Sequence, residues 1–404
     1  MKVPKGWQVM RMAEAGEIYG GRQRSPHLTN GTMRPYLRVA NVMDGYIDAS
    51  DVKQMKFTDS EFEKFKLRAG DILLNEGQSL ELCGRPALYR GVPPDCCFQN
   101  TIIRFRPSPG THGNFALQLF KFLLASGRFA SISSKTTSIA HLGLSRFAGL
   151  KAAFPPSEEQ PKIASILEAC DRGTESQQAL LAAKVERKRG LMQQLLTGKT
   201  RFKEFKGERW RTHRLGDLLQ EVDRYVTFDD DHTYRLASIR RRSEGLFFRE
   251  ALQGNDIKTK VMKTIRAGDF ILSKMQVVHG AWGLVTPEFD GMFVSDSYIS
   301  LVPKDGSPLK IEFLNYLSQM RFLRHLAYIC SHGVHIEKMT FNLEDFLHKK
   351  ITIPPTLDEQ AKIVGVLSAC DDEIKVLQKQ LEALKEQKRG LMQKLLTGEI
   401  RVKL

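Results

Sequence analysis

The run Lys188-Arg189-Gly190-Leu191-Met192-Gln193 returns unchanged in this chain as Lys388-Arg389-Gly390-Leu391-Met392-Gln393. The identity extends well beyond these six residues. Residues 160–201 match residues 360–401 at a constant shift of 200 without a gap, with 22 identities in 42 positions. A match at this level is an internal repeat, which decides the architecture before any other feature. The 404 residues are therefore organised as two copies of one unit.

The segments that precede the two runs also resemble each other, but more loosely. The matching pairs are Trp7 with Trp210, Arg38–Val42 with Arg235–Ile239, and Arg68-Ala69-Gly70-Asp71 with Arg266-Ala267-Gly268-Asp269. Short alternating apolar stretches predict strands in both segments, and a short helical stretch follows them. We therefore expect two globular heads of mixed α/β (α+β) structure, at residues 1–154 and 200–353.

The repeated runs lie in two long helices, which we predict at residues 155–199 and 354–404. In the second helix, apolar residues recur at spacings of four and three from Ile363 to Leu395, which is the pattern of a coiled-coil seam. The corresponding seam of the first helix is polar in its middle, so we expect it to pair with its twin. The two seams meet only if the second helix runs back along the first. The sequence therefore predicts an antiparallel coiled coil with one head at each end, and an internal pseudo-two-fold repeat.

The chain is strongly basic. Its formal net charge is +15, and residues 1–157 alone hold 21 Lys and Arg against 12 Asp and Glu. Excess positive charge favours a polyanionic partner, because each neutralised phosphate releases condensed counterions. Charge alone leaves open a basic protein that has no nucleic-acid partner.

The remaining composition excludes several classes of protein. The six cysteines include no CxxC pair, and no stretch of eighteen apolar residues occurs. The first pattern is unlike a zinc or disulfide framework, and the second is unlike a membrane span. We therefore expect a reduced, cytoplasmic chain that does not enter a membrane.

These motifs resemble the specificity subunit of Type I restriction-modification enzymes. The resemblance rests on the Arg-Ala-Gly-Asp strand starts, on the repeated runs, and on the helix starts Pro155…Glu159-Gln160-Pro161-Lys162-Ile163 and Pro354…Glu359-Gln360-Ala361-Lys362-Ile363. It covers both halves of the chain. Pro161 is a departure from Ala361, but it falls in the first helical turn, where proline is tolerated.

The resemblance implies that each head is a target-recognition domain, which reads one half of a split site in double-stranded DNA. It implies that the helix pair holds the two halves apart and docks two methyltransferase (modification) subunits. Those subunits would carry S-adenosylmethionine, so that this chain itself has no cofactor. Restriction/translocase subunits would join the complex for cleavage.

Two alternatives differ in class. The first is a DNA-modifying enzyme with its own methyltransferase or nuclease centre, and the second is a coiled-coil scaffold that binds only proteins. None of the Pro-Pro pairs has the polar residue before it and the aromatic residue after it that an adenine methyltransferase needs. Gly198-Lys199-Thr200 lacks the earlier glycine of a phosphate-binding loop, since position 193 is Gln193. We therefore expect no catalytic residue, and the basic heads argue against the scaffold.

Polar loops supply the candidate contacts to DNA, because Arg, Lys and hydroxyl groups suit phosphates and base edges. The candidates are Arg22, Arg24, Lys135 and Thr136 in the first head, and Arg240, Arg241, Arg242, His332 and His335 in the second. An ordinary solvated loop is the alternative for each of them. The two histidines lie near Cys330, but this is a weak metal pattern, and we expect no metal site.

The repeated helical runs are alike although the heads differ, so we assign the runs to assembly rather than to base recognition. The predicted partner contacts are Lys188, Arg189, Leu191, Lys388, Arg389 and Leu391.

Overall fold

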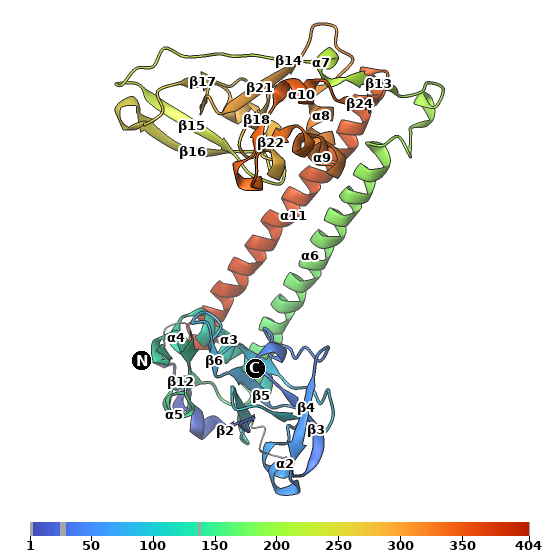
Figure 1. Cartoon of the computed structure of the whole chain (residues 1–404). Coiled ribbons are helices and arrows are strands. Elements are labelled where there is room, and N and C mark those ends of the chain that lie inside the picture. The colour runs from blue at the N-terminus through green and yellow to red at the C-terminus, as the bar shows by residue number, and fades with distance from the viewer. Residues whose placement is uncertain (1–2, 25–29, 136–138, 404) are drawn as a thin grey trace. The chain divides into compact units, whose positions relative to one another are not determined.

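The computed structural model describes residues 3–24, 30–135 and 139–403. The chain divides into two compact units. The first unit comprises Met1–Gln178 and Lys379–Leu404, and the second comprises Ala179–Gln378. Each unit therefore combines one head with part of both long helices, which is the arrangement expected from an internal repeat (Figure 1).

The first head is built on an antiparallel sheet with the strand order β2-β9-β5-β7. Its strands are β2 (Gly16–Gly20), β9 (Ile102–Pro107), β5 (Ile72–Asn75) and β7 (Pro86–Leu88). A second sheet has the order β4-β3-β8, from β4 (Lys53–Phe57), β3 (Thr32–Leu37) and β8 (Cys97–Phe98). Two smaller sheets join β1 (Gln8–Arg11) to β12 (Lys151–Phe154), and β10 (Ser134–Lys135) to β11 (Ala140–His141) and β6 (Gly77–Gln78). The helices are α1 (Met12–Ala15), α2 (Asp59–Phe65), α3 (Gly113–Ala125), α4 (Arg128–Ile132) and α5 (Leu144–Gly149), with the 3-10 turn η1 (Val39–Asn41).

The second head repeats this topology. Its main sheet has the order β14-β21-β18-β19, from β14 (Leu219–Glu221), β21 (Tyr298–Pro303), β18 (Phe270–Ser273) and β19 (Trp282–Leu284). The second sheet has the order β16-β15-β20-β17, from β16 (Leu246–Gln253), β15 (Thr233–Ile239), β20 (Phe293–Ser295) and β17 (Met262–Thr264). The remaining pairs are β13 (Arg211–Arg214) with β24 (Lys350–Ile353), and β22 (Ser331–His332) with β23 (Thr340–Phe341).

The helices of the second head are α7 (Leu215–Leu218), α8 (Ile311–Ser318), α9 (Arg321–Ile329) and α10 (Leu343–Leu347). Five 3-10 turns complete this half, namely η2 (Lys203–Phe205), η3 (Gly254–Asp256), η4 (Val277–His279), η5 (Pro287–Phe289) and η6 (Ile336–Lys338). The prediction of two mixed α and β heads from an internal repeat is confirmed, because the main sheets of the two heads have corresponding strand orders, while the second sheet has one more strand, β17, in the second head.

The Arg-Ala-Gly-Asp motif makes the turn that starts the central strand of each main sheet. Gly70 and Gly268 have φ values of +98° and +93°, a conformation that favours glycine. The carboxylate of Asp71 accepts a hydrogen bond from the Arg68 amide at 2.7 Å, which closes the turn. The equivalent bond from Arg266 to Asp269 is 2.9 Å long. The strands that follow, β5 and β18, are buried along their whole length.

The two long helices are α6 (Glu159–Leu195) and α11 (Leu357–Thr397). They begin just after the Pro-Pro pairs, as the start signals indicate. The second helix ends at its Thr-Gly residues, whereas α6 ends two residues before Thr197. Every predicted seam position, from Ile163 to Leu195 and from Ile363 to Leu395, is buried or half-buried, while most other positions of these helices are exposed. The predicted seam is therefore confirmed in both helices. Among the described residues, no helix is long and apolar enough to cross a membrane.

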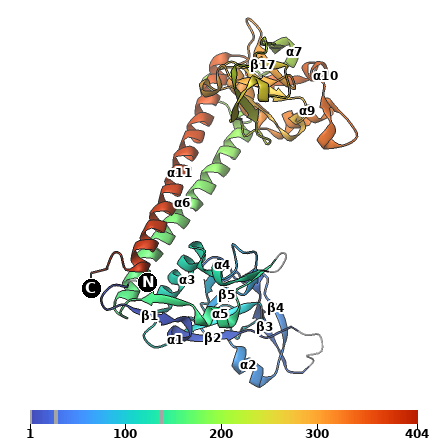
Figure 2. The same ribbon diagram turned by 90° about the vertical axis from the view of Figure 1, so that its left-hand side faces the viewer.

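Within each unit, α6 and α11 run antiparallel (Figures 1 and 2). In the first unit, Asp171 pairs with Lys388, and Gln177 bonds to Gln380 at 3.0 Å. In the second unit, Lys184 pairs with Glu373 at 2.5 Å, and Lys188 pairs with Asp371 at 2.6 Å. Residue numbers rise along one helix as they fall along the other. The polar middle of α6 thus bonds to α11, as predicted.

The ends of both helices enter the cores of the heads. The first core contains Ile163 and Leu167 from the start of α6, and Met392, Leu395 and Leu396 from the end of α11. The second core contains the equivalent residues, which are Met192, Leu195, Leu196, Ile363 and Leu367. Burying each side chain of this size stabilises the folded chain by about 1.5–3 kcal/mol. The close repetition of the helical sequences therefore has a structural cause, because both copies dock on heads of the same fold.

Candidate nucleic-acid interface

The structure corrects the prediction that Arg22 of the first head contacts DNA. Its side chain is only 6% exposed, and its Nε donates to Glu61 Oε1 at 2.8 Å. The guanidinium also donates to the Lys56 carbonyl and lies 4.8 Å from the centre of the Phe57 ring. These contacts hold the start of α2 against the neighbouring sheet. Sequence reasoning missed this role because it depends on Glu61, 39 residues away.

Arg24 and Lys135, by contrast, are exposed. Lys135 lies on β10, and this strand is held in place by Arg146, whose Nη2 donates to Ser134 Oγ at 2.9 Å and to the His141 carbonyl at 2.8 Å. His141 in turn lies 3.1 Å from Glu76. Lys135 therefore lies on a strand that is fixed to its own head. Thr136 lies outside the described residues.

In the second head, the turn Arg240-Arg241-Arg242-Ser243 is fixed to its own domain through Arg242 and Ser243. Arg242 and Ser243 have positive φ values of +64° and +59°. Their amides donate to the carbonyls of His279 and Gly280, at 2.7 and 2.8 Å. The Trp282 indole donates to Ser243 Oγ at 2.7 Å. These bonds compensate for the strained backbone, and all three arginine side chains are exposed.

The structure brings this turn beside the other candidate segment of the second head. Arg241 pairs with Glu337 at 2.8 Å, and His279 lies 3.1 Å from the same carboxylate. Glu337 belongs to the segment between β22 and β23, which also carries the exposed His335 and follows the exposed His332 of β22. His332 Nε2 lies 3.0 Å from Asp345. The arginine turn and the histidine segment, about ninety residues apart in sequence, thus form one surface.

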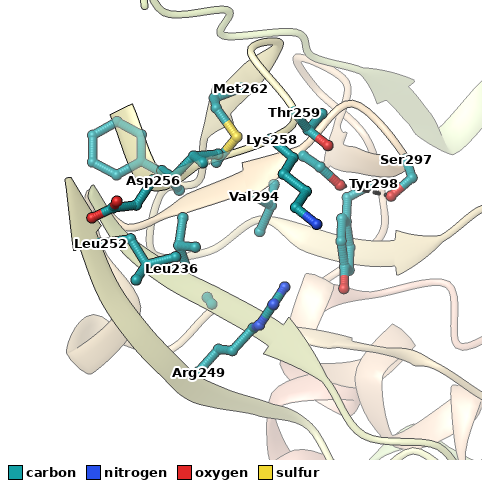
Figure 3. Close-up of a pocket in the computed structure, with 14 residues that line it drawn as sticks. Leu236, Arg249, Leu252, Asp256, Lys258, Thr259, Met262, Val294, Ser297 and Tyr298 are labelled. Carbon is teal, nitrogen blue, oxygen red and sulfur yellow. Dashed lines mark hydrogen bonds between the residues drawn. The ribbon is translucent and has the colours of Figure 1, made fainter. Parts of the chain in front are cut away.

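A pocket of about 550 Å³ lies elsewhere in the second head, and sequence reasoning did not find it (Figure 3). Its apolar floor includes Leu236, Val294 and Met262. In Figure 3, the polar ends of Arg249, Lys258 and Tyr298 point toward one another across it. These three residues come from β16, from the segment after η3, and from β21. No local motif contains them, so only the fold reveals the site.

Near the pocket, the two heads differ at one element. In the first head, β4 is followed by α2, whose Phe62 belongs to the cluster on the sheet β4-β3-β8. Phe65 of the same helix lies 6.2 Å from Phe98, between ring centres. In the second head, the segment after β16 forms η3 and a loop instead, and Ile257 of this segment and Met262 at the start of β17 are buried in a cluster with Leu236. Within the described residues, Lys258 has no ion-pair partner, so its charge faces the pocket uncompensated.

Four of the predicted partner contacts are used within the chain itself. Lys188 pairs with Asp371 and lies 5.4 Å from the Tyr316 ring centre, and Lys388 pairs with Asp171. Leu191 and Leu391 are half-buried against the core of the second and the first head, respectively. These four side chains make contacts within the units and are half-buried, and their assignment to partner binding stays a prediction. Arg189 and Arg389 are exposed and remain open to a partner.

The Asp171 cluster consists of Asp171 and its three partners Lys388, Lys121 and Gln118. Burial alone raises the pKa of Asp171, but hydrogen bonds from Lys388 and Gln118 and the charges of Lys121 and Lys388 outweigh it, so the pKa lies below its ordinary value. In the second unit, burial and the hydrogen bond to Asp371 raise the pKa of Tyr316. Both aspartates are therefore structural acceptors. No group of three or more His, Cys, Asp or Glu side chains suited to a metal occurs in the described part of the chain.

Comparisons with known proteins agree with this architecture. A family model described as the Type I restriction modification DNA specificity domain matches residues 4–187 and again residues 208–386. The chain is 25% identical over its whole length to the MjaX specificity subunit of Methanocaldococcus jannaschii, covering 95% of that protein. It is 23% identical to the MjaVIII type I restriction enzyme specificity subunit of the same organism, again over its whole length and 95% of the relative.

Solved structures show the same fold. The HsdS subunit from Thermoanaerobacter tengcongensis matches with a TM-score of 0.52 at 19% identity, over 99% of both chains. The Type-I restriction-modification system S subunit from M. genitalium matches with a TM-score of 0.56 at 13% identity, over 98% of both chains. With two matched domains that together span most of its length, the chain belongs to the Type I restriction-modification DNA specificity family.

Proposed function

We propose that this chain binds double-stranded DNA through both heads, and that each head reads one half of a split site. One observation carries the proposal: the two units share their topology and the residues that dock the helices, while the exposed polar segments of the heads differ. A common scaffold with two different surfaces is what recognition of two unlike half-sites requires. The chain is the specificity component, and the chemistry belongs to its partners.

The contacts divide by chemistry. The exposed basic side chains of Arg24, Lys135 and Arg240–Arg242 suit phosphates, as does the pocket lined by Arg249 and Lys258. Histidines 332 and 335 and the hydroxyl of Thr136 suit base edges or the sugar-phosphate backbone. Phosphate contacts set position and affinity, whereas base contacts set the sequence that is recognised. Arg22 is not part of this interface.

The proposed partners follow from family membership. Two methyltransferase subunits would bind this chain and carry S-adenosylmethionine, and restriction/translocase subunits would join them. Arg189 and Arg389 support an assembly surface on the helices, because they are exposed at equivalent positions of α6 and α11. Two equivalent surfaces on one chain fit two copies of one partner.

Selection from a library of random duplexes tests the proposal. The whole chain is incubated with the library, and bound duplexes are recovered and sequenced. We expect a motif of two specified parts separated by unspecified base pairs. Recovery of one continuous motif, or of no motif, would contradict the split-site proposal. Retention of mixed duplex DNA in a filter-binding assay would exclude the protein-only scaffold. Methyl transfer by this chain alone would instead favour the enzyme.

A further inference from the structure

The segment between β22 and β23, here called the 333–339 loop, is held at its base by contacts within the second head. Its ends are joined by the strand pairs Ser331 with Phe341 and His332 with Thr340. Met339 is buried, and the Lys338 amide donates to the His335 carbonyl at 2.8 Å. A Cβ atom at Gly333 would lie 2.9 Å from the Met339 Cα atom, so only glycine allows this close approach. The loop is therefore packed tightly at its base.

At the outer side of this loop, Val334 is 96% exposed. No other large apolar side chain in the described residues is exposed to this extent, the next being Val92 at 62%. Ile336 in the same loop is 47% exposed. Valine is branched at Cβ and stiff at χ1, so it loses little entropy when a ligand covers it. Nothing within the second unit covers this apolar group.

The surroundings of Val334 favour a polyanion over an apolar protein surface. Lys338 and His335 of the loop and His332 at the end of β22 are exposed, and Arg241 is tied to the loop through Glu337. Arg240 and Arg242 continue the basic surface on the adjacent turn. Arg241 and His332 pair with Glu337 and Asp345, whereas Lys338, Arg240 and Arg242 have no ion pair among the described residues. An apolar side chain beside such basic groups matches the major groove of DNA, where phosphates flank base edges and the thymine methyl group is the apolar feature.

We propose that Val334 reads a thymine by packing against its 5-methyl group in the major groove. This inference rests on the proposed function and goes further, because it names one residue, one base and one chemical group. The cations around the loop bind the flanking phosphates, and the 333–339 loop holds Val334 at a fixed position toward the base edge. Cytosine has no methyl group at this position, so the contact discriminates between the two pyrimidines.

The test removes the methyl group from either side of the contact. The probe is a duplex recovered by the selection above, in which each thymine is replaced in turn by deoxyuridine. The half-site of the second head is the one at which ethylation of the phosphates no longer interferes with binding once Arg240, Arg241 and Arg242 are replaced by alanine. We expect one deoxyuridine in that half-site to weaken binding of the unchanged chain about three- to tenfold. V334S should weaken binding of the thymine duplex to the same extent, and should then be insensitive to that deoxyuridine.

Two exposed valines provide matched controls. Val261 lies in the same head and is 51% exposed, and Val92 lies in the first head. V261S and V92S should keep the full deoxyuridine effect, and all three variants should unfold at the same temperature as the unchanged chain. The inference is overturned if no thymine of this half-site is sensitive to deoxyuridine. It is also overturned if V334S still binds the deoxyuridine duplex more weakly than the thymine duplex by the factor that the unchanged chain shows. In each case the split motif itself would persist, whereas its absence would be a failure of the proposed function.

Discussion

At the residue scale, a charged side chain is useful to a ligand only if the fold leaves it free. Arg22 and Arg24 are two positions apart in one polar segment, yet the first is buried against Glu61 and the second is exposed. Lys188 and Arg189 differ in the same way, because the first lies on the seam and the second beside it. Burial of an unpaired charge is costly, so each inward cation is matched by a carboxylate.

The Asp171 cluster leads to a prediction about acid stability. The pKa of Asp171 is lowered in the folded chain, so its ionised form stabilises the first unit at pH values above the ordinary pKa of 3.8. This contribution is lost as the pH falls through the lowered pKa. We expect D171N to reduce the free energy of unfolding by about 1–3 kcal/mol at pH 7, since Lys388 loses its partner. Urea unfolding should show that the deficit shrinks as the pH falls below 3.8.

D305N is the control, because Asp305 is exposed on a turn of the second head. Its stability should follow that of the unchanged chain at each pH. A deficit in D171N that is equally large at pH 7 and at acid pH would mean that shape, and not charge, accounts for the role of Asp171.

At the scale of elements, the arginine turn after β15 is expected to act through phosphates. Replacing Arg240, Arg241 and Arg242 together by alanine should weaken DNA binding. It should also reduce the slope of log binding constant against log salt concentration by about two to three, since roughly 0.9 counterion is released per neutralised phosphate. Filter binding at several salt concentrations measures this slope.

The matched control removes the same charge elsewhere. Lys199, Lys203 and Lys206 are exposed in the segment that follows α6, and replacing them by alanine should leave the slope within one unit of its original value. If both triple variants change the slope equally, the net charge of the chain and not the arginine turn governs binding.

The long helices carry the second prediction at this scale. R189E and R389E combined should leave the fold intact, because both side chains are exposed, but should weaken binding of the methyltransferase subunits at least tenfold. Co-purification and thermal unfolding measure the two effects. L195D is the contrast, because Leu195 is 5% exposed in the second core and its replacement should unfold that unit. If the double variant binds the methyltransferase subunits normally, Arg189 and Arg389 are not part of the partner surface.

At the scale of the whole molecule, α6 and α11 are each continuous from one unit into the other. If helix length sets the gap between half-sites, both helices must be lengthened together, because they are paired. Inserting seven residues after Gln178 and seven after Gln378 keeps the seam and adds about 10 Å, at ~1.5 Å per residue. The preferred gap should grow by about three base pairs, at ~3.4 Å each.

The same library selection measures the gap and the half-sites together. The bases recognised should stay the same, because neither head is altered. A gap that does not change, or a broad range of accepted gaps, would show that the helices do not act as a ruler. Insertion into one helix only is the control, and it should destabilise the chain because the two seams no longer match.

The amino-acid sequence by itself determined the repeat, the two helices, their seam and the mixed composition of the heads. These features are local or periodic: a heptad pattern needs only neighbouring turns of one helix, and the Arg-Ala-Gly-Asp turn closes within four residues. The resemblance to the family rested on the same local motifs. These motifs recur in both halves because the ends of both helices dock on heads of the same fold.

Only the tertiary structure decided which of the basic residues face outward and which groups meet. Arg22 is buried because Glu61 and Phe57 come from elements that fold onto it. The arginine turn and the 333–339 loop form one surface because Arg241 reaches Glu337, and the pocket of Arg249, Lys258 and Tyr298 combines residues from β16, the segment after η3 and β21. Contacts between distant segments depend on how whole elements pack, and no local pattern in the sequence encodes that packing.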